Sequence, residues 1–312
     1  MPIFRGKLIF MADYVAAQIA LLFPGQGTQS PGMGKVFAET KYFDIAKNAS
    51  DVLGQDLASL ICDESPDALS STHNAQLAVL ITSLMSYEKF KEKNETPICF
   101  AGHSLGQVTA LICAGVLSFE EGIKFASIRA QETQKCADNK PGAMAALLGA
   151  DNDSASELCN NLDELWVAND NAPGQIVVAG NPQSIEKAQE VYKDYAIKKV
   201  VKLPVNGAFH TPYMEDATEA LKATLSEMTF NKPVCGVASN DDGRAYTVAD
   251  VWQEKLALHV SRPVLWRHCM DAAWLLAPKC AYEIGYGNTL AGLAKRCTPE
   301  LEVKSFYTGD DE

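Results

Sequence analysis

The chain of 312 residues is poor in basic side chains and has no long apolar run. Lysine and arginine number 27 against 39 aspartates and glutamates, which gives a formal net charge of −12. Because nucleic acids and anionic membranes repel an acidic surface, we expect neither as a partner. No apolar run approaches the roughly 18–20 residues that a membrane span needs, so we expect no transmembrane helix.

Paired cysteine motifs are also missing. The nine cysteines include no CxxC pair, and most lie within apolar runs such as Ile98-Cys99-Phe100. An odd number of cysteines in such surroundings indicates small buried thiols in a reducing compartment, not a disulfide framework or a zinc site. We therefore predict a cytoplasmic protein that binds no metal.

The first 18 residues lack the features of a signal peptide. Their apolar stretch from Leu8 to Met11 is short, Asp13 follows it, and no clear small-residue cleavage site is present. We interpret residues 1–18 as an N-terminal extension outside the folded domain, with Met11 as a candidate start.

Short apolar runs alternate with segments of helical spacing over the first 140 residues. Residues 19–23 and 97–101 are predicted strands, and apolar spacing near 3.6 predicts helices over 43–60, 75–90, 104–114 and 119–136. This alternation favours an α/β fold with a parallel sheet covered by helices on both faces. We expect a large, α/β-hydrolase-like domain.

The pattern changes between residues 141 and 204. Predicted strands at 143–148, 164–168, 175–179 and 198–203 enclose helices at 152–161 and 182–195, with a turn over Asn171–Gly174. The order βαββαβ is that of a ferredoxin-like unit. We predict a small subdomain at 141–204, inserted into a large catalytic domain of residues 19–140 and 205–312 that ends with a helix near 290–296.

Ser104 is the candidate nucleophile. It lies in Gly102-His103-Ser104-Leu105-Gly106, between a predicted strand and a predicted helix. In such a GxSxG elbow the glycines permit a sharp turn, which exposes the serine hydroxyl at the carboxyl end of the sheet. The start of the helix directs N–H groups and its positive dipole end at an oxyanion. A serine that only caps the helix is disfavoured, because strand, glycines and helix occur together.

A serine nucleophile needs a base, and the chain has five histidines. His103 is adjacent to Ser104, but neighbours across such a turn point apart. His210 lies in a loop directly after the last strand of the predicted insert, where a scaffold can hold a functional side chain. His73, His259 and His268 lie in or beside helical stretches, where a lone histidine usually belongs to the surface or the core. We predict His210 as the base.

Four segments together resemble the malonyl-CoA:acyl carrier protein transacylases, over Ile19 to about Tyr307. They are residues 23–29 (FPGQGTQ), residues 102–106 (GHSLG), Arg129, and residues 208–214 with Ala-Phe-His, Pro212 and Met214. The resemblance implies malonyl transfer from malonyl-CoA to the phosphopantetheine thiol of acyl carrier protein through a malonyl-serine, for fatty acid biosynthesis. It implies no cofactor beyond the two substrates.

The resemblance also implies a role for each matching residue. Ser104 is the expected nucleophile and His210 the general base and acid, while Gln26 and Leu105 supply backbone N–H groups to an oxyanion hole. Arg129 would bind the free malonyl carboxylate, since a guanidinium can meet a carboxylate with two parallel hydrogen bonds. From the residues alone, an ordinary cation on a helix surface is the favoured interpretation of Arg129. Phe209, directly before His210, resembles the residue found at this position in malonyl-selective members.

The sequence departs from the family pattern at three positions. Gln107 stands where glutamate is frequent, and Thr133 where methionine is common. Leu265 stands in the segment where many members have a glutamine whose main-chain carbonyl orients the histidine. Because any residue offers a carbonyl, we expect Leu265 to orient His210.

Carrier proteins are acidic, so we expect a local basic docking surface in spite of the negative net charge. The candidates are Lys187, Lys193, Lys198, Lys199 and Lys202 on the small subdomain, and Arg262, Arg267, Lys295 and Arg296 on the large domain; the run 198–202 is favoured. A coenzyme A thioester and acyl carrier protein are the expected partners of a monomer.

Two alternatives remain open. A serine hydrolase or thioesterase needs an acidic residue between the serine and the histidine, and it gives Arg129 no role. A non-catalytic subunit that binds carrier protein has no need of Ser104 and His210. A polyketide pathway could also use the product.

Overall fold

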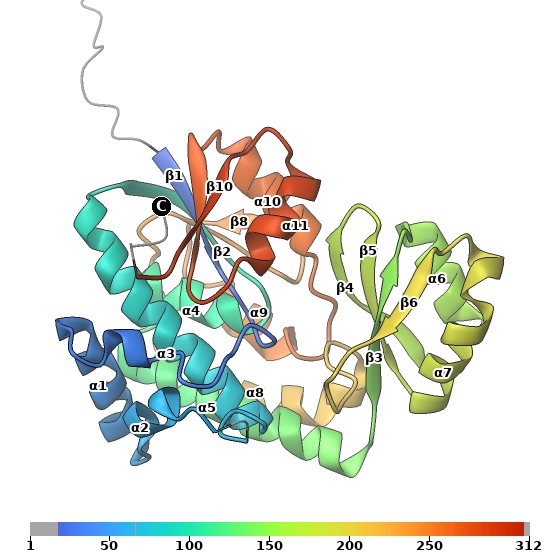
Figure 1. Ribbon diagram of the computed structural model, residues 1–312, viewed down its shortest axis with the longest axis horizontal. Coiled ribbons are helices and arrows are strands. Elements are labelled where there is room, and N and C mark those ends of the chain that lie inside the picture. The colour runs from blue at the N-terminus through green and yellow to red at the C-terminus, as the bar shows by residue number, and fades with distance from the viewer. Residues whose placement is uncertain (1–17, 66, 309–312) are drawn as a thin grey trace, which may run out of the picture.

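A six-stranded sheet forms the centre of the larger part of the computed structural model, which describes residues 18–65 and 67–308 (Figure 1). Its strand order is β10-β9-β1-β2-β7-β8, and every neighbouring pair is parallel except β7 with β8. The strands are β1 (Gln18–Phe23), β2 (Thr96–Gly102), β7 (Gly236–Ala238), β8 (Ala245–Tyr246), β9 (Cys280–Ile284) and β10 (Val303–Phe306). The predicted α/β fold with a parallel sheet is confirmed. The expected extension lies outside the described residues, apart from Gln18.

Helices cover both faces of this sheet. Successive side chains of β1 point to opposite faces of the sheet. Ile19, Leu21 and Phe23 belong to one apolar core, and Ala20 and Leu22 belong to the other. The first core includes α1 (Asp44–Leu53), α2 (Leu57–Cys62), α3 (Thr72–Phe90), α4 (Leu105–Cys113), α5 (Phe119–Asn139), α8 (Glu215–Ser226) and α9 (Trp252–Leu258). The second includes α10 (Trp266–Leu275) and α11 (Thr289–Cys297).

The helix predicted over 43–60 is wrong in one respect. Gly54 adopts a left-handed conformation, with φ of 63°, and ends α1. Asp56 then caps α2 by accepting a hydrogen bond from the backbone N–H of Ser59 at 2.9 Å. One predicted helix is therefore two, because a left-handed glycine is a common helix terminator.

A second, four-stranded antiparallel sheet stands beside the first (Figure 1). It contains β3 (Ala143–Leu148), β4 (Leu165–Ala172), β5 (Gln175–Gly180) and β6 (Lys199–Lys202) in the order β4-β5-β3-β6, with α6 (Asn152–Asn160) and α7 (Pro182–Val191) in between along the chain. Ala145, Leu147 and Val178 pack in a core with these helices. Met144 and Val177, on the opposite face, line a cleft toward the large sheet.

Strand β4, which is longer than predicted, also contacts the segment that precedes α10. The N–H of Val264 donates to the carbonyl of Ala168, and the N–H of Asp170 donates to the carbonyl of Val264, each at 2.9 Å. The buried carboxylate of Asp170 accepts from the Arg267 guanidinium at 2.6 Å. Residues 169–172 pair with residues 175–177 of β5, so the strand continues to Ala172, and the predicted turn at 171–174 is wrong in its first two residues.

Within the described ranges, no helix is both long and apolar enough to cross a membrane.

Candidate active site

A cleft of about 280 Å³ lies where the carboxyl ends of β1 and β2 face the small sheet. Ligands of open α/β sheets bind at this edge, because loops at the strand ends enclose a crevice there. The side chains that line it include Gln26, Gln76, Ser104, Arg129 and His210. Gln76 and Arg129 come from α3 and α5, while the others come from loops and the start of α4.

The turn at Ser104 is a strained elbow. Ser104 adopts φ of 50° and ψ of −111°, a conformation that is rare for a residue other than glycine. A Cβ atom on Gly102 would lie 1.9 Å from the carbonyl oxygen of Gly106, and one on Gly106 would lie 2.0 Å from that of Phe23. The glycines are therefore required because strand β2, helix α4 and strand β1 approach within backbone contact.

Ser104 and His210 are in direct contact. The serine Oγ lies 2.8 Å from Nε2 of His210. The other ring nitrogen, Nδ1, donates to the carbonyl of His259 at 2.9 Å and to that of Arg262 at 3.2 Å. Because carbonyls only accept, the proton of a neutral ring belongs on Nδ1. Nε2 is then free to accept the proton of the Ser104 hydroxyl.

The expectation for Leu265 is wrong. Its carbonyl accepts from the N–H of Cys269 at 3.0 Å, because Leu265 is the N-cap of α10. The carbonyls that orient His210 come from the preceding loop, at His259 and Arg262. The resemblance implied that a main-chain carbonyl orients the histidine, and such carbonyls are present, but they belong to residues other than Leu265.

Burial lowers the pKa of His210 to about 3, and the positive charge of Arg129 is the next cause. His210 is 4% exposed. The ring is consequently neutral near pH 7, in the protonation state that a general base needs before reaction.

Arg129 is buried beside the nucleophile. Its guanidinium donates to Oε1 of Gln76 at 2.6 Å and to Oγ of Ser104 at 3.1 Å, while its Nε–H has no partner. No carboxylate pairs with it in the part of the chain that the structure describes. Burial lowers its pKa to about 10, so it remains a cation. An unpaired buried charge is costly, which indicates a site for an anion.

The N–H of Ser104 does not face the cleft. It donates to Oδ1 of Asn240 at 2.8 Å, so it has no free donor for an oxyanion. Leu105 opens α4, and the N–H groups of a first helical turn have no partner within the helix. Gln26, in the loop after β1, also lines the cleft. These two positions remain the candidates for the oxyanion hole.

Sequence reasoning missed four residues of the site. Oδ1 of Asn171 accepts a hydrogen bond from Nε2 of His103 at 2.8 Å, and Gln76 accepts one from Arg129. Asn240 and His259 lie behind the dyad. Gln76 could have been noticed, since it is the one polar residue in the apolar run 75–81 of α3. Asn240 follows the short strand β7 at the carboxyl edge of the sheet, where polar residues are functional candidates.

The other histidines differ in burial and in their contacts. His268 is exposed, and Nε2 of His73 lies 3.0 Å from Oγ of Ser127. His259 is 2% exposed, and its ring centroid lies 5.5 Å from that of His210. His259 is therefore a core histidine, as expected, and it lies directly behind His210.

The fold and the site define a class: an α/β protein with a nucleophile-elbow serine, a neutral histidine and a buried anion-binding arginine, as acyl-transferring enzymes use. Comparison with known proteins agrees. Residues 20–275 match the model of the acyl transferase domain family. The malonyl CoA-acyl carrier protein transacylase of Bacillus subtilis is 36% identical over 296 residues, 92% of each chain.

Solved structures give the same result. An acyl-carrier-protein S-malonyltransferase from Burkholderia pseudomallei superposes with a TM-score of 0.88 at 33% identity, covering 93% of this chain and 96% of the other. A malonyl-transacylase in complex with a type II polyketide acyl-carrier protein superposes at 0.89 with 30% identity, over the same shares. The chain belongs to the acyl transferase family, in its group of malonyl CoA-acyl carrier protein transacylases.

Proposed function

We propose that the protein transfers a malonyl group from malonyl-CoA to the phosphopantetheine thiol of acyl carrier protein, through a malonyl ester of Ser104. The observation that carries this proposal is Arg129, a buried cation without an acidic partner among the described residues, 3.1 Å from the nucleophile. The terminal carboxylate of a malonyl group supplies the missing anion, and an acetyl group does not.

In the first step, Nε2 of His210 accepts the hydroxyl proton of Ser104 while Oγ attacks the thioester carbonyl carbon. The negative charge that develops on the carbonyl oxygen is stabilised by the N–H groups of Gln26 and Leu105; one such donor contributes about 10²–10³ in rate. The carbon–sulfur bond breaks, and the leaving CoA sulfur takes the proton from His210. The ester on Ser104 remains.

The second step is the reverse with another thiol. Nε2 of His210 accepts the proton of the pantetheine thiol, whose sulfur attacks the ester carbonyl. The carbon–oxygen bond breaks, and His210 returns the proton to Oγ of Ser104. Side chains and the two substrates supply every atom, so the step needs no cofactor.

The arrangement around His210 favours transfer over the hydrolase alternative. A hydrolase triad holds the base with a carboxylate, whereas the carbonyls of His259 and Arg262 hold this one. Arg129 also has a role only where the acyl group carries an anion. The contact between Ser104 and His210 equally disfavours a non-catalytic binding subunit.

For the acidic carrier protein we propose a docking surface of exposed lysines near β6. Several predicted cations have partners within the chain: Lys187 pairs with Glu190, Arg262 with Asp241 and Arg267 with Asp170. Arg296 donates to Gln175 and to the carbonyl of Pro173, and Lys193 lies 5.9 Å from the ring of Tyr192. Exposed and without an ion pair among the described residues are Lys198, Lys199, Lys202 and Lys295.

We further propose that residues 141–204 are a ferredoxin-like subdomain inserted between the two parts of the catalytic domain, 19–140 and 205–312. The element order βαββαβ and the sheet order β4-β5-β3-β6 support this assignment. Nine free cysteines support a reducing, cytoplasmic location. We propose that the protein acts as a monomer in fatty acid biosynthesis.

The test of the function is a comparison of acceptors. Purified protein is mixed with radiolabelled malonyl-CoA and either holo-acyl carrier protein or water alone, and labelled carrier protein and free malonate are measured. We expect label on the carrier thiol at a rate far above malonate release. Release of malonate at the same rate with and without carrier protein would identify a hydrolase and overturn the proposal.

A further inference from the structure

The side chain of Asn240 forms hydrogen bonds with the backbone of the elbow at Ser104. This fully buried residue lies just beyond β7. Its Nδ2 donates to the carbonyl of Gly102 at 2.8 Å, and its Oδ1 accepts from the N–H of Ser104 at 2.8 Å. Its own N–H donates to Oε1 of Gln107 at 2.6 Å. One side chain thus satisfies the backbone on both sides of His103.

The elbow needs this support because its conformation is unusual. A buried N–H or C=O without a partner costs about 1–3 kcal/mol. The turn at Ser104 lies between the strand and the helix, and Asn240 pairs the two backbone groups that flank the turn on the interior side. The position of Oγ on Ser104 therefore depends on a residue 136 positions away.

His259 connects Asn240 to the base. Its Nε2 lies 3.1 Å from Oδ1 of Asn240, and its main-chain carbonyl accepts from Nδ1 of His210 at 2.9 Å. Since the amide nitrogen of Asn240 donates to Gly102, its oxygen is the acceptor, and His259 must carry its proton on Nε2. Nδ1 of His259 has no partner within the described chain. A second proton there would be buried and unpaired, so the ring is neutral.

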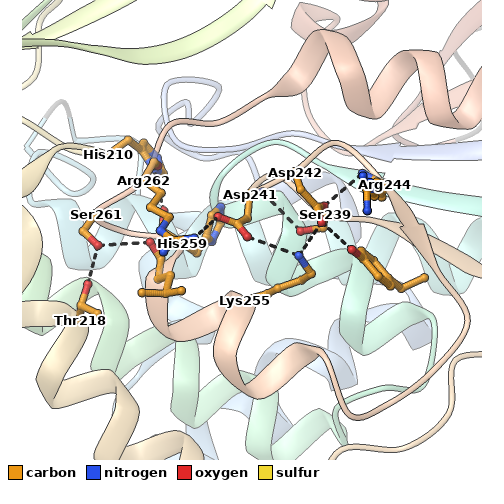
Figure 2. Close-up of polar contacts among 12 residues, drawn as sticks. His210, Thr218, Ser239, Asp241, Asp242, Arg244, Lys255, His259, Ser261 and Arg262 are labelled. Atoms are coloured by element: carbon orange, nitrogen blue, oxygen red, sulfur yellow. Dashed lines mark hydrogen bonds and ion pairs between the residues drawn. The ribbon is translucent and has the colours of Figure 1, made fainter.

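Asp241, the residue after Asn240, binds the side chain of the other residue whose carbonyl contacts His210. Asp241 accepts from Arg262 at 3.1 Å and from Lys255 at 3.3 Å, and Figure 2 shows these contacts beside His259. Arg262 provides the second carbonyl on His210. The carbonyls of His259 and Arg262 bind the base, and the side chains of these two residues bind Asn240 and Asp241, respectively.

We propose that Asn240 and His259 act together as positioning residues that keep the Ser104 hydroxyl and the His210 ring at reacting distance. Neither touches the substrate. Asn240 fixes the elbow, and the hydrogen bond between the two side chains fixes His259, whose carbonyl fixes the base. The inference rests on the proposed roles of Ser104 and His210.

The test uses two substitutions that keep the carbonyl of residue 259. In His259→Gln an amide N–H can still reach Asn240, whereas in His259→Leu no donor remains. The measured quantity is the single-turnover rate of malonyl-enzyme formation, together with the KM for malonyl-CoA and the melting temperature. A misplaced reacting group costs on the order of 10²-fold. We expect a loss of about 10- to 100-fold for His259→Leu, with KM changed by less than about threefold.

His259→Gln should recover most of the rate, to within about fivefold of wild type. The control His268→Leu, at an exposed histidine, should have no effect. Asn240→Leu should lose as much as His259→Leu or more, and adding His259→Leu to it should cost little further, because one hydrogen bond links the two. If Asn240→Leu does not fold, the comparison of Gln with Leu at residue 259 still decides.

Equal rates for the Gln and Leu variants at residue 259 would overturn the inference, as would multiplied losses in the double variant. A wild-type protein that forms no adduct at Ser104 would instead refute the proposed function, so the two failures can be told apart.

Discussion

Replacement of Arg129 by alanine tests the substrate assignment most sharply. The guanidinium is 3% exposed and pairs with Gln76 and Ser104 but with no described carboxylate. Removing one partner of a buried ion pair typically costs about 3–5 kcal/mol. At about 1.4 kcal/mol per factor of ten, that cost corresponds to a loss of roughly 10²- to 10³-fold or more.

This loss should appear only for malonyl-CoA. The acetyl group of acetyl-CoA has no free carboxylate, so its kcat/KM should change by less than about tenfold or rise, because binding no longer leaves a buried cation unpaired. The assay measures transfer of each acyl group to free pantetheine thiol, which removes any effect of carrier docking. The ratio of the two kcat/KM values is the readout.

Lys124→Ala is the matched control, since Lys124 lies on the same helix but is exposed and pairs with Glu120. It should leave the ratio unchanged. A variant Arg129→Ala that prefers malonyl-CoA as strongly as wild type would refute the reasoning, whatever its absolute rate.

Three further predictions follow from the same geometry. Because burial and Arg129 lower the pKa of His210 to about 3, the pH profile of kcat/KM for acetyl-CoA should show no inflection near pH 6.5. In Arg129→Ala the loss of kcat/KM at acid pH should begin at a higher pH, because the nearby positive charge is gone. An inflection near pH 6.5 in wild type would contradict this. Burial holds the pKa of His259 well below its ordinary value, so the stability that it contributes is present above pH 6.5 and is lost as the pH falls. Between pH 7.5 and 5, the free energy of unfolding in urea should therefore fall less for His259→Gln than for wild type, by up to about 2 kcal/mol, and an equal fall would contradict a neutral ring. Gly106→Ala should destabilise the fold by at least about 3 kcal/mol, because its Cβ would lie 2.0 Å from the carbonyl oxygen of Phe23; a melting temperature within 2 °C of wild type, roughly the error of the method, would show that the elbow can open.

The parts of the structure that depend on local sequence could be predicted. The apolar run at 19–23, the elbow at 102–106 and the strands and helices at 143–203 are each defined by residues that lie close together in the chain. Turn residues and glycines limit these segments, so periodicity and punctuation are sufficient. Ser104 and His210 were both identified in this way, and the structure places them in contact.

The parts that depend on remote contacts could not be predicted. Val264 pairs with Ala168 and Asp170 of β4, although it lies almost 100 positions away along the chain. The carbonyls on His210 belong to His259 and Arg262 instead of Leu265, since the path of that loop is set by its attachment to Asn240 and Asp241. No pattern within the segment 259–266 shows which carbonyl faces the ring.

The central claim is a covalent malonyl group on Ser104. Intact-mass measurement of the protein after brief mixing with malonyl-CoA, followed by acid quenching, tests it directly with wild type and Ser104→Ala side by side. We expect wild type to gain the mass of one malonyl group, to lose it when holo-acyl carrier protein is added, and Ser104→Ala to gain none. An adduct that persists in Ser104→Ala, or one on wild type that the carrier thiol cannot remove, would contradict the account.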